Sequence, residues 1–437
     1  MFLRRRKRVC VISLDGVPGS LLEDAFSQGR LVPLRSLWAE GEAAELTSTV
    51  PPISSVAWAT YATGVNPGGH GIYGFADRDP ATMGQRLLTS RDVAAPTLWH
   101  RLGTLGRNSA VINVPLTYPA APLKGWLVAG FPAPELKAAA YPPELGETLA
   151  KDKYLVDPDP GLASDPPMFF AEVKRALDSR RRIALELLRR PWDFFHLHIM
   201  ATDRLNHFFF RARHEGEPNH EDFWAAYEEV AELVGEVAEA LPRGTELVLM
   251  SDHGFSDIAW EIDLNAHLVE RGLLELSGEG SGPERVAPGS VAYSLTPGRT
   301  YLLRAGRERG GTIPREEAPR WLERVAADLL ALKTPDGAPA VAEVLRGEEL
   351  YHGPKAALGP DLVALPAPRV ELRGGWEGGP TAKPASRQGG HTLTGAFIWI
   401  RGRTPRAGTV IDVPPTLWAL LGHPGPNEFE GKALIER

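Results

Sequence analysis

The chain has 437 residues, of which 43% are hydrophobic and 24% are charged. This composition is typical of a soluble globular protein, and the length predicts one large α/β domain with an insertion, or two domains. The formal net charge of −7 argues against a nucleic-acid-binding surface. The single cysteine, Cys10, excludes an intramolecular disulfide framework and predicts a reducing compartment, by default the cytoplasm.

The N-terminus carries a basic run, residues 4–8, that resembles the start of a signal peptide. The apolar stretch after it is short and is interrupted by Asp15-Gly16 without a small-residue cleavage site, so we interpret the run as a solvated leader. No window reaches the ~18 apolar residues of a membrane span. We therefore predict no membrane span, and the sequence leaves the oligomeric state open.

Predicted strands and helices alternate along the first half of the chain. The helix after Pro51-Pro52 is expected to begin close to Ser54, because the two prolines force an extended backbone. The strands are expected at residues 8–13, 109–114, 192–199 and 246–251, with an apolar segment at 43–46. The helices are expected at residues 20–28, 55–63, 97–105, 171–190 and 221–240, with a loop at 64–74.

The second half continues with a helix after Asn265, strands at 300–304, 361–365 and 396–400, and helices at 315–332 and 415–421. The alternation predicts an α/β fold, a doubly wound, mostly parallel central sheet with helices on both faces. Residues 131–167, rich in Pro, Ala and Lys, are interpreted as an inserted cap segment, and residues 277–289 as a flexible linker or loop. We interpret residues 1–437 as a single domain.

Three short apolar runs lead to Asp15, Asp203 and Asp252. Because the carboxyl ends of parallel strands meet at one edge of a sheet, we expect these carboxylates to share a crevice. Crowded carboxylates repel one another, and a bound cation relieves the repulsion. Nearby histidines supply nitrogen ligands that zinc or manganese accepts. The sequence therefore predicts a metal site.

The histidines beside these aspartates are candidate ligands. Asp203 and His207 are spaced i, i+4, which places them on one helical face; the alternative is an N-cap aspartate with an unrelated surface histidine. His253 follows Asp252 directly, and the alternative is a plain β-turn. His391 follows two glycines, and on its own it is more often a structural histidine.

Ser54 is the candidate nucleophile. A hydroxyl at a helix N-terminus faces free backbone N–H groups and the positive end of the helix dipole, a preferred phosphate position. The alternative is that Ser54 or Ser55 is merely the N-cap, and from the residues alone this alternative is preferred, because serine is a common cap.

Taken together, these motifs resemble the alkaline phosphatase superfamily, and most closely its type I phosphodiesterase and nucleotide pyrophosphatase branch. The matching segments are Asp15-Gly16 and residues 51–58, 63–72, 202–207, 251–255, 390–391 and 411–417. The resemblance implies two divalent metal ions, zinc first and manganese as the alternative. It implies one ion held by Asp15, Asp252, His253 and Ser54, and another held by Asp203, His207 and His391. It also implies a phosphoserine intermediate at Ser54 and a structural role for His70 near the entrance.

We therefore expect a metal-dependent hydrolase that cleaves phosphodiester bonds of a small-molecule substrate, with nucleotide pyrophosphates as one candidate class. The branch usually has a phosphate-binding asparagine near the position of Gly74-Phe75, and its absence here counts against a nucleotide. The first alternative is a phosphomonoesterase or phosphomutase that uses the same metals and Ser54. The second alternative is a non-catalytic metal-binding relative, which should lack a ligand or the nucleophile. A sulfatase is excluded, because no Cys/Ser-x-Pro-x-Arg motif follows Ser54.

Three arginines and two histidines are further candidates for roles near the site. A monoesterase needs a basic clamp, for which Arg78, Arg86 and Arg204 are candidates, although a surface position is the preferred interpretation of each. His196 and His198 form an H-x-H pair on one strand face, and we interpret both as core histidines.

Overall fold

The computed structural model describes residues 6–436 and divides the chain into two compact units. Within the described residues, unit 1 contains residues 6–66, 89–255 and 391–436, and unit 2 contains residues 67–88 and 256–390. Of the predicted solvated basic run, residues 4–5 lie outside the described residues, Arg6 and Lys7 are exposed as predicted, and Arg8 begins the first strand. None of the helices in residues 6–436 combines the length and the apolar character needed to cross a bilayer.

Unit 1 is built on a nine-stranded sheet with the strand order β19-β2-β18-β9-β1-β8-β5-β6-β7. Its middle is parallel and contains β9 (Thr245–Met250), β1 (Arg8–Leu14), β8 (Phe194–Ile199), β5 (Ser109–Ile112) and β6 (Gly125–Val128). Antiparallel pairs involve β18 (Ala396–Arg401) with β9 and with β2 (Gly41–Thr47), and β7 (Ala140–Tyr141) with β6. The edge strand β19 (Gly408–Thr409) is parallel to β2. The predicted mostly parallel α/β sheet is confirmed.

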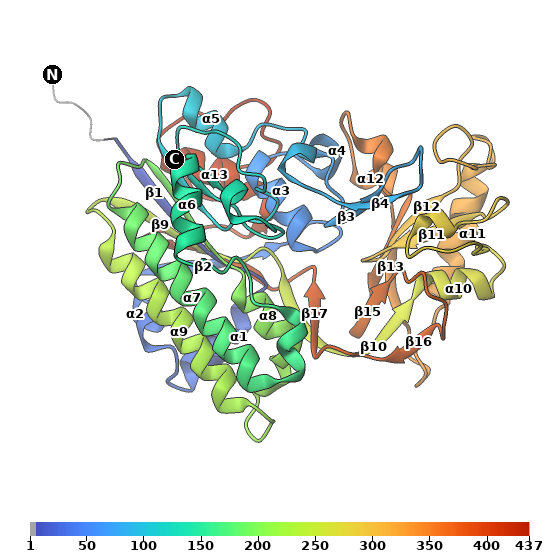
Figure 1. Ribbon diagram of the computed structural model, residues 1–437, viewed down its shortest axis with the longest axis horizontal. Coiled ribbons are helices and arrows are strands. Elements are labelled where there is room, and N and C mark those ends of the chain that lie inside the picture. The colour runs from blue at the N-terminus through green and yellow to red at the C-terminus, as the bar shows by residue number, and fades with distance from the viewer. Residues whose placement is uncertain (1–5, 437) are drawn as a thin grey trace. The chain divides into compact units, whose positions relative to one another are not determined.

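Helices cover both faces of this sheet. Side chains alternate along each strand, so a strand of continuous apolar residues presents an apolar surface on both faces, and both must be buried. Cys10 and Ile12 of β1 belong to one apolar core, and Val9 and Val11 belong to the other. The first face carries α1 (Gly19–Ser27), α2 (Val32–Trp38), α7 (Pro166–Leu188), α8 (Ala201–Phe209) and α9 (His220–Ala240), with α7 and α9 side by side (Figure 1). The second face carries α3 (Ser54–Thr63), α5 (Leu98–Thr104) and α13 (Val413–Leu420). The doubly wound arrangement is confirmed.

The segment of residues 131–167 contributes to the sheet and to its core. It contains β7, α6 (Pro143–Lys151) and the 3-10 turns η2 (Leu136–Ala139) and η3 (Pro160–Ser164). Strand β7 extends the sheet beyond β6, and Leu145 and Leu149 of α6 are buried in the core that contains Cys10. A role of this segment as a cap stays a prediction.

Unit 2 has its own apolar core and three small sheets. The first contains β15 (Arg369–Arg373), β10 (Gly254–Asp263), β16 (Ala382–Pro384) and β17 (Gly389–Thr392). The second contains β11 (Ala292–Leu295), β12 (Arg299–Leu302), β14 (Leu362–Pro366) and β13 (Val341–Arg346), and β3 (Ala76–Arg78) pairs with β4 (Gln85–Leu87). The helices are α4 (Pro67–His70), α10 (Leu264–Glu270), α11 (Ala318–Leu330) and α12 (Gly347–Leu350).

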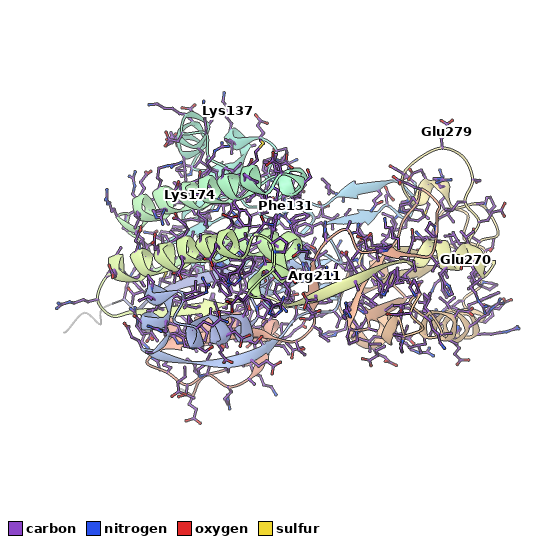
Figure 2. The ribbon with its side chains drawn as sticks, turned by 90° about the horizontal axis from the view of Figure 1, so that it is seen from below. Phe131, Lys137, Lys174, Arg211, Glu270 and Glu279 are labelled. Carbon is purple, nitrogen blue, oxygen red and sulfur yellow. The ribbon has the colours of Figure 1, made fainter. Side chains whose placement is uncertain are left out.

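Residues 277–289 of unit 2 form an irregular connection that contains the 3-10 turn η5 (Pro283–Arg285). Figure 2 shows Glu279 on a loop that projects from the unit, and its side chain is exposed. The predicted loop is therefore present, and its flexibility stays a prediction.

Candidate active site

Asp15, Asp203 and Asp252 follow three neighbouring parallel strands. Asp15 comes directly after β1, Asp252 follows β9, and Asp203 lies in the first turn of α8, just after β8. The strand order β9-β1-β8 makes these three carboxyl ends adjacent. Each aspartate is at most 1% exposed. The topology therefore places three carboxylates at one edge of the sheet, inside the protein.

The first group of candidate ligands surrounds the Nε2 atom of His253. This atom lies 3.2 Å from Ser54 Oγ, 3.5 Å from Asp15 Oδ1 and 3.4 Å from Asp252 Oδ2. Ser54 Oγ also donates a hydrogen bond of 3.1 Å to Asp15 Oδ1. The candidate nucleophile is therefore in direct contact with two of the predicted ligands.

The second group surrounds the Nε2 atom of His391. This atom lies 3.0 Å from Asp203 Oδ1 and 3.0 Å from His207 Nε2. His207 Nε2 lies 3.5 Å from the same carboxylate oxygen, because both residues project from one face of α8. The structure thus brings all seven predicted site residues into two adjacent groups within unit 1.

The backbone orients two of the imidazole rings. His391 Nδ1 lies 3.0 Å from the carbonyl oxygen of Pro52, and His253 Nδ1 lies 3.1 Å from that of Gly254. A carbonyl only accepts, so each Nδ1 carries the proton and a neutral ring has its lone pair on Nε2. Both lone pairs then face carboxylate oxygens. That arrangement is repulsive unless a proton or a metal ion lies between them.

Burial and the neighbouring charges together shift the pKa values of this site. Burial raises the pKa of Asp252 well above its usual value, and the charge of Asp15 raises it further. Burial opposes the protonated form of His253, but the carboxylates of Asp252 and Asp15 outweigh it and raise its pKa to about 9. The cluster therefore requires positive charge, either from protons or from a cation.

The donor set fits divalent metal ions. The ligand atoms of Asp15, Asp252 and His253 lie within 4.8 Å of one another, and so do those of Asp203, His253 and His391. Asp252 Oδ2 is buried and accepts no hydrogen bond from any group within residues 6–436, so it has coordination capacity left. Carboxylate oxygen with imidazole nitrogen suits Zn²⁺ and Mn²⁺. His253 borders both groups, which places the two candidate ion sites next to each other.

Two of the simpler interpretations of these residues are wrong. Helix α8 begins at Ala201 and its N-cap is Met200, so Asp203 lies inside the helix and is not its cap. Helix α3 begins at Ser54 and its N-cap is Ile53, with no side-chain capping bond, so the Ser54 hydroxyl is free of a capping role. Its hydrogen bond goes to Asp15 instead.

Several neighbours of Asp15 were not predicted. Trp58 Nε1 donates to Asp15 Oδ2 at 2.9 Å, and Thr202 Oγ1 donates to the backbone oxygen of Asp15 at 2.7 Å. Asn206 Nδ2 donates to the backbone oxygen of Gly16 at 2.8 Å. Trp58 lies one helical turn after Ser54, and this spacing was a usable signal.

Arg204 is partly buried, and the prediction of a surface position was wrong for it. Its guanidinium donates to Asp203 Oδ2 at 3.0 Å and to Asp157 Oδ2 at 2.9 and 2.6 Å. It also lies over the ring of Phe131, which Figure 2 labels, at 5.1 Å from the ring centroid. Asp157 belongs to the segment 131–167, and no sequence spacing connected it to the site.

The other two candidate clamps lie in unit 2. The surface prediction was wrong for Arg78, which is 6% exposed and pairs with Glu308 at 3.1 Å. It is confirmed for Arg86, whose side chain is exposed.

The remaining histidines are buried. His196 and His198 are completely buried, as the core interpretation predicted, and His198 also faces Asp15. His70 is completely buried in α4, and its ring accepts from the backbone N–H of Ile72 at 3.1 Å. Its place near an entrance stays a prediction.

Comparisons with known proteins identify similar folds. Phosphonoacetate hydrolase from Sinorhizobium meliloti 1021 is similar with a TM-score of 0.64 and 16% identity, covering 95% of each chain. Murine ectonucleotide pyrophosphatase / phosphodiesterase 5 is similar with a TM-score of 0.60 and 14% identity, covering 98% of this chain and 100% of the other. These likenesses concern the fold. A comparison with curated protein sequences gave no match.

The sequence pattern of a family described as type I phosphodiesterase / nucleotide pyrophosphatase matches residues 9–419. That range includes every candidate ligand and Ser54. Its description names the hydrolysis of phosphoric esters, and this supports an enzyme of that class. The chain therefore belongs to the type I phosphodiesterase / nucleotide pyrophosphatase family.

Proposed function

We propose that this protein is a metal-dependent hydrolase of phosphodiesters, with nucleotide pyrophosphates among the candidate substrates, and that it acts through a phosphoserine intermediate at Ser54. One observation supports this most strongly. The hydroxyl at the start of α3 lies 3.1 Å from one buried candidate ligand and 3.2 Å from another. A serine that only packs or caps a helix does not need two such neighbours.

In this proposal Asp15, Asp252, His253 and Ser54 hold one divalent ion, and Asp203, His207 and His391 hold the other, with zinc as the first choice and manganese as the alternative. Such ions lower the pKa of the nucleophilic hydroxyl and neutralise the charge of the phosphate. They also explain how a chain with a net charge of −7 handles an anionic ester.

The chain itself supplies the nucleophile and its orientation. Ser54 Oγ attacks phosphorus, a bond from phosphorus to the ester oxygen breaks, and an alcohol or phosphate monoester leaves. Water then cleaves the phosphoserine. The protons lost by Ser54 and by that water end on the leaving group and on the re-formed Ser54 hydroxyl. The start of α3 adds the positive end of a helix dipole at the phosphate.

The phosphomonoesterase alternative needs a basic side chain that binds the extra phosphate charge. Arg204 does not meet this need, because its guanidinium already pairs with Asp157 and Asp203. The non-catalytic alternative predicts a missing ligand or nucleophile, whereas this chain has all seven residues. One structural neighbour is described in complex with phosphonoacetate, so that compound belongs in the substrate panel. For location, the sole cysteine still favours a reducing compartment such as the cytoplasm.

The test compares hydrolysis of bis-p-nitrophenyl phosphate, p-nitrophenyl phosphate and phosphonoacetate by chelator-stripped protein with Zn²⁺ or Mn²⁺ added back. Preference for the diester supports the proposal, and preference for the monoester supports the phosphomonoesterase alternative. Binding of two ions without cleavage of any compound supports a non-catalytic role. Preference for phosphonoacetate would contradict the proposed phosphodiester specificity.

Ser54→Ala should reduce turnover of the diester on the order of 1000-fold or more, even at metal concentrations that saturate the three ligands left to the first ion. Ser55→Ala is the matched control, because Ser55 Oγ is buried, has no hydrogen-bond partner within residues 6–436 and is one residue away. We expect Ser55→Ala to retain turnover. Full turnover by Ser54→Ala would remove the covalent mechanism.

A further inference from the structure

A line of buried polar side chains lies behind Asp15. Tyr61 Oη lies 3.2 Å from His196 Nδ1, and His196 Nε2 lies 2.8 Å from Ser13 Oγ. Ser13 Oγ lies 2.9 Å from His198 Nδ1. All four side chains are 0% exposed. We call Tyr61, His196, Ser13 and His198 the histidine–serine chain.

The strand register explains why these residues meet. Strands β1 and β8 are parallel, with Ser13 opposite His198 and Val11 opposite His196. Residues two apart on a strand share a face, so Ser13, His196 and His198 all point to the face that α3 covers. Helix α3 supplies Tyr61 to this line, and the same helix begins with Ser54.

The histidine–serine chain ends at one oxygen of Asp15. His198 Nε2 lies 3.1 Å from Asp15 Oδ2, which also accepts from Trp58 Nε1 at 2.9 Å. The other oxygen, Oδ1, accepts from Ser54 Oγ and lies 3.5 Å from His253 Nε2. The two oxygens therefore have separate partners. One faces the protein core, and the other faces the nucleophile and the candidate ion.

The proton positions are consistent along this line. His198 Nε2 carries its proton because it faces a carboxylate. In the neutral ring, His198 Nδ1 accepts from the Ser13 hydroxyl, which accepts from His196 Nε2–H, and the Tyr61 hydroxyl donates to His196 Nδ1. Burial lowers the pKa of His196 well below its usual value, which keeps that ring neutral. Tyr61, His196 and Ser13 each donate to one acceptor, and the His198 ring accepts from Ser13 at Nδ1 while its Nε2 lies in close contact with the Asp15 carboxylate.

We propose that His198 is a positioning residue for Asp15: held by the histidine–serine chain, it fixes Asp15 Oδ2 and so turns Oδ1 toward Ser54 and the first metal ion. This inference rests on the proposed function, in which Asp15 and Ser54 share that ion. Partners that orient a metal ligand typically change metal affinity or activity by about 10–100-fold when they are lost. A histidine buried only for packing has no such selective effect on one ion.

The experiment compares His198→Leu with His198→Gln. Leucine removes the polar contact to Asp15, whereas the side-chain amide nitrogen of glutamine can occupy the place of Nε2 and donate to Oδ2. We expect His198→Leu to lower kcat on bis-p-nitrophenyl phosphate and to weaken the first ion about 10–100-fold, with the second ion changed by less than about twofold. His198→Gln should recover most of both losses.

Two further variants keep the inference testable if His198→Leu does not fold. Ser13→Ala removes the group that holds His198 Nδ1, and we expect a smaller loss of the same kind. Tyr61→Phe removes only the far end of the histidine–serine chain, four contacts away from Asp15, and should lower the thermal midpoint without changing either ion affinity. Affinities are measured by calorimetric titration of the stripped full chain with Zn²⁺ alone.

The outcomes separate this inference from the proposed function. A natural-sequence protein that binds no divalent ion contradicts the proposed function. A second outcome is that the natural-sequence protein binds two ions, while His198→Leu binds each of them as tightly as the natural sequence does and keeps the same kcat. That result overturns only the inference. The inference is also overturned if all the variants weaken both ions equally and glutamine is no better than leucine, because that is the result of a general packing defect.

Discussion

The Nε2 atoms of His207 and His391 lie 3.0 Å apart, and each is within 3.5 Å of Asp203 Oδ1. Two imidazole nitrogens this close either share a proton or direct their lone pairs at a common ion. Because His391 Nδ1 is committed to the carbonyl of Pro52, its Nε2 is available as a ligand. This pair is therefore the direct place to test the second ion.

His207→Ala should bind one ion per chain where the natural sequence binds two. A ligand present at about 100 times its dissociation constant stabilises a protein by about 2.7 kcal/mol, so saturating Zn²⁺ should raise the thermal midpoint of the variant less. Metal content after gel filtration and thermal unfolding with and without chelator check this. His214→Ala is the control, because His214 is exposed. Two tightly bound ions in His207→Ala would contradict the assignment of that ligand.

Removal of Arg204 should lower both stability and affinity for the second ion. Arg204→Met leaves the buried carboxylates of Asp157 and Asp203 without their shared cation, a change that typically destabilises by about 3–5 kcal/mol. Arg204→Lys keeps the charge but cannot pair with both carboxylates, so its loss should be intermediate.

The double variant Arg204→Met/Asp157→Asn provides the control for Arg204. It removes one of the uncompensated carboxylates, so we expect it to recover part of the stability in urea unfolding but not the ion affinity. If Arg204→Met alone unfolds at the same urea concentration as the natural sequence, the pairing of Arg204 with Asp157 and Asp203 contributes nothing to stability.

The stability of the metal-free protein should fall as the pH drops from 7 to 5, in part because of His70. Burial lowers the pKa of His70 to about 3, whereas a histidine in the unfolded chain titrates near 6.5, about the usual value. Below that value the unfolded chain binds a proton that the folded chain does not bind. The resulting loss from His70 is about 2 kcal/mol at pH 5, and the contribution is fully present above the unfolded pKa.

His70→Gln should therefore show a flatter dependence of unfolding free energy on pH. Urea unfolding of both proteins across this range measures the difference, in which the other titrating groups cancel. Parallel curves for the two proteins would mean that His70 does not titrate differently on folding.

Gly16→Ala should damage the first ligand group. Gly16 has φ +62°, and a Cβ there would lie 2.5 Å from the ring of Phe255 and 2.9 Å from His253 Cε1. The substitution therefore displaces His253, in addition to a left-handed backbone strain of about 1–2 kcal/mol. Gly29→Ala is the matched control, because its φ is +77° and nothing lies within 4 Å of the added Cβ.

Both alanine variants should lose stability, but only Gly16→Ala should lose turnover and first-ion affinity. Equal turnover in the two variants would indicate that His253 tolerates the displacement or is not a ligand.

The central part of the fold could be predicted because its strands are continuous apolar runs. The expected strand at 246–251 is β9 (Thr245–Met250), and the expected strand at 8–13 is β1 (Arg8–Leu14). Strand β10 (Gly254–Asp263) was missed, because Asp257 and Glu261 interrupt its apolar pattern. The expected loop at 64–74 contains the short helix α4 (Pro67–His70). The strands β3 and β4 have only three residues each, too few for a periodic signal.

The part of the site that depends on strand ends and on helical spacing could be predicted. Those rules placed Asp15, Asp203 and Asp252 together and put His207 on the face of Asp203. They could not place His198 beside Asp15, because the register between β1 and β8 depends on tertiary packing. The pairing of Arg204 with Asp157 was equally inaccessible, since these residues are 47 positions apart.

The order of the ligands along the chain has a consequence for biosynthesis. Residues 256–390 of unit 2 are inserted between His253 and His391. During translation, residues 256–390 must therefore be synthesised before His391 leaves the ribosome. A polypeptide that ends before His391 contains Ser54 but lacks one proposed ligand of the second ion, so we expect hydrolytic activity only after residue 391 has been added.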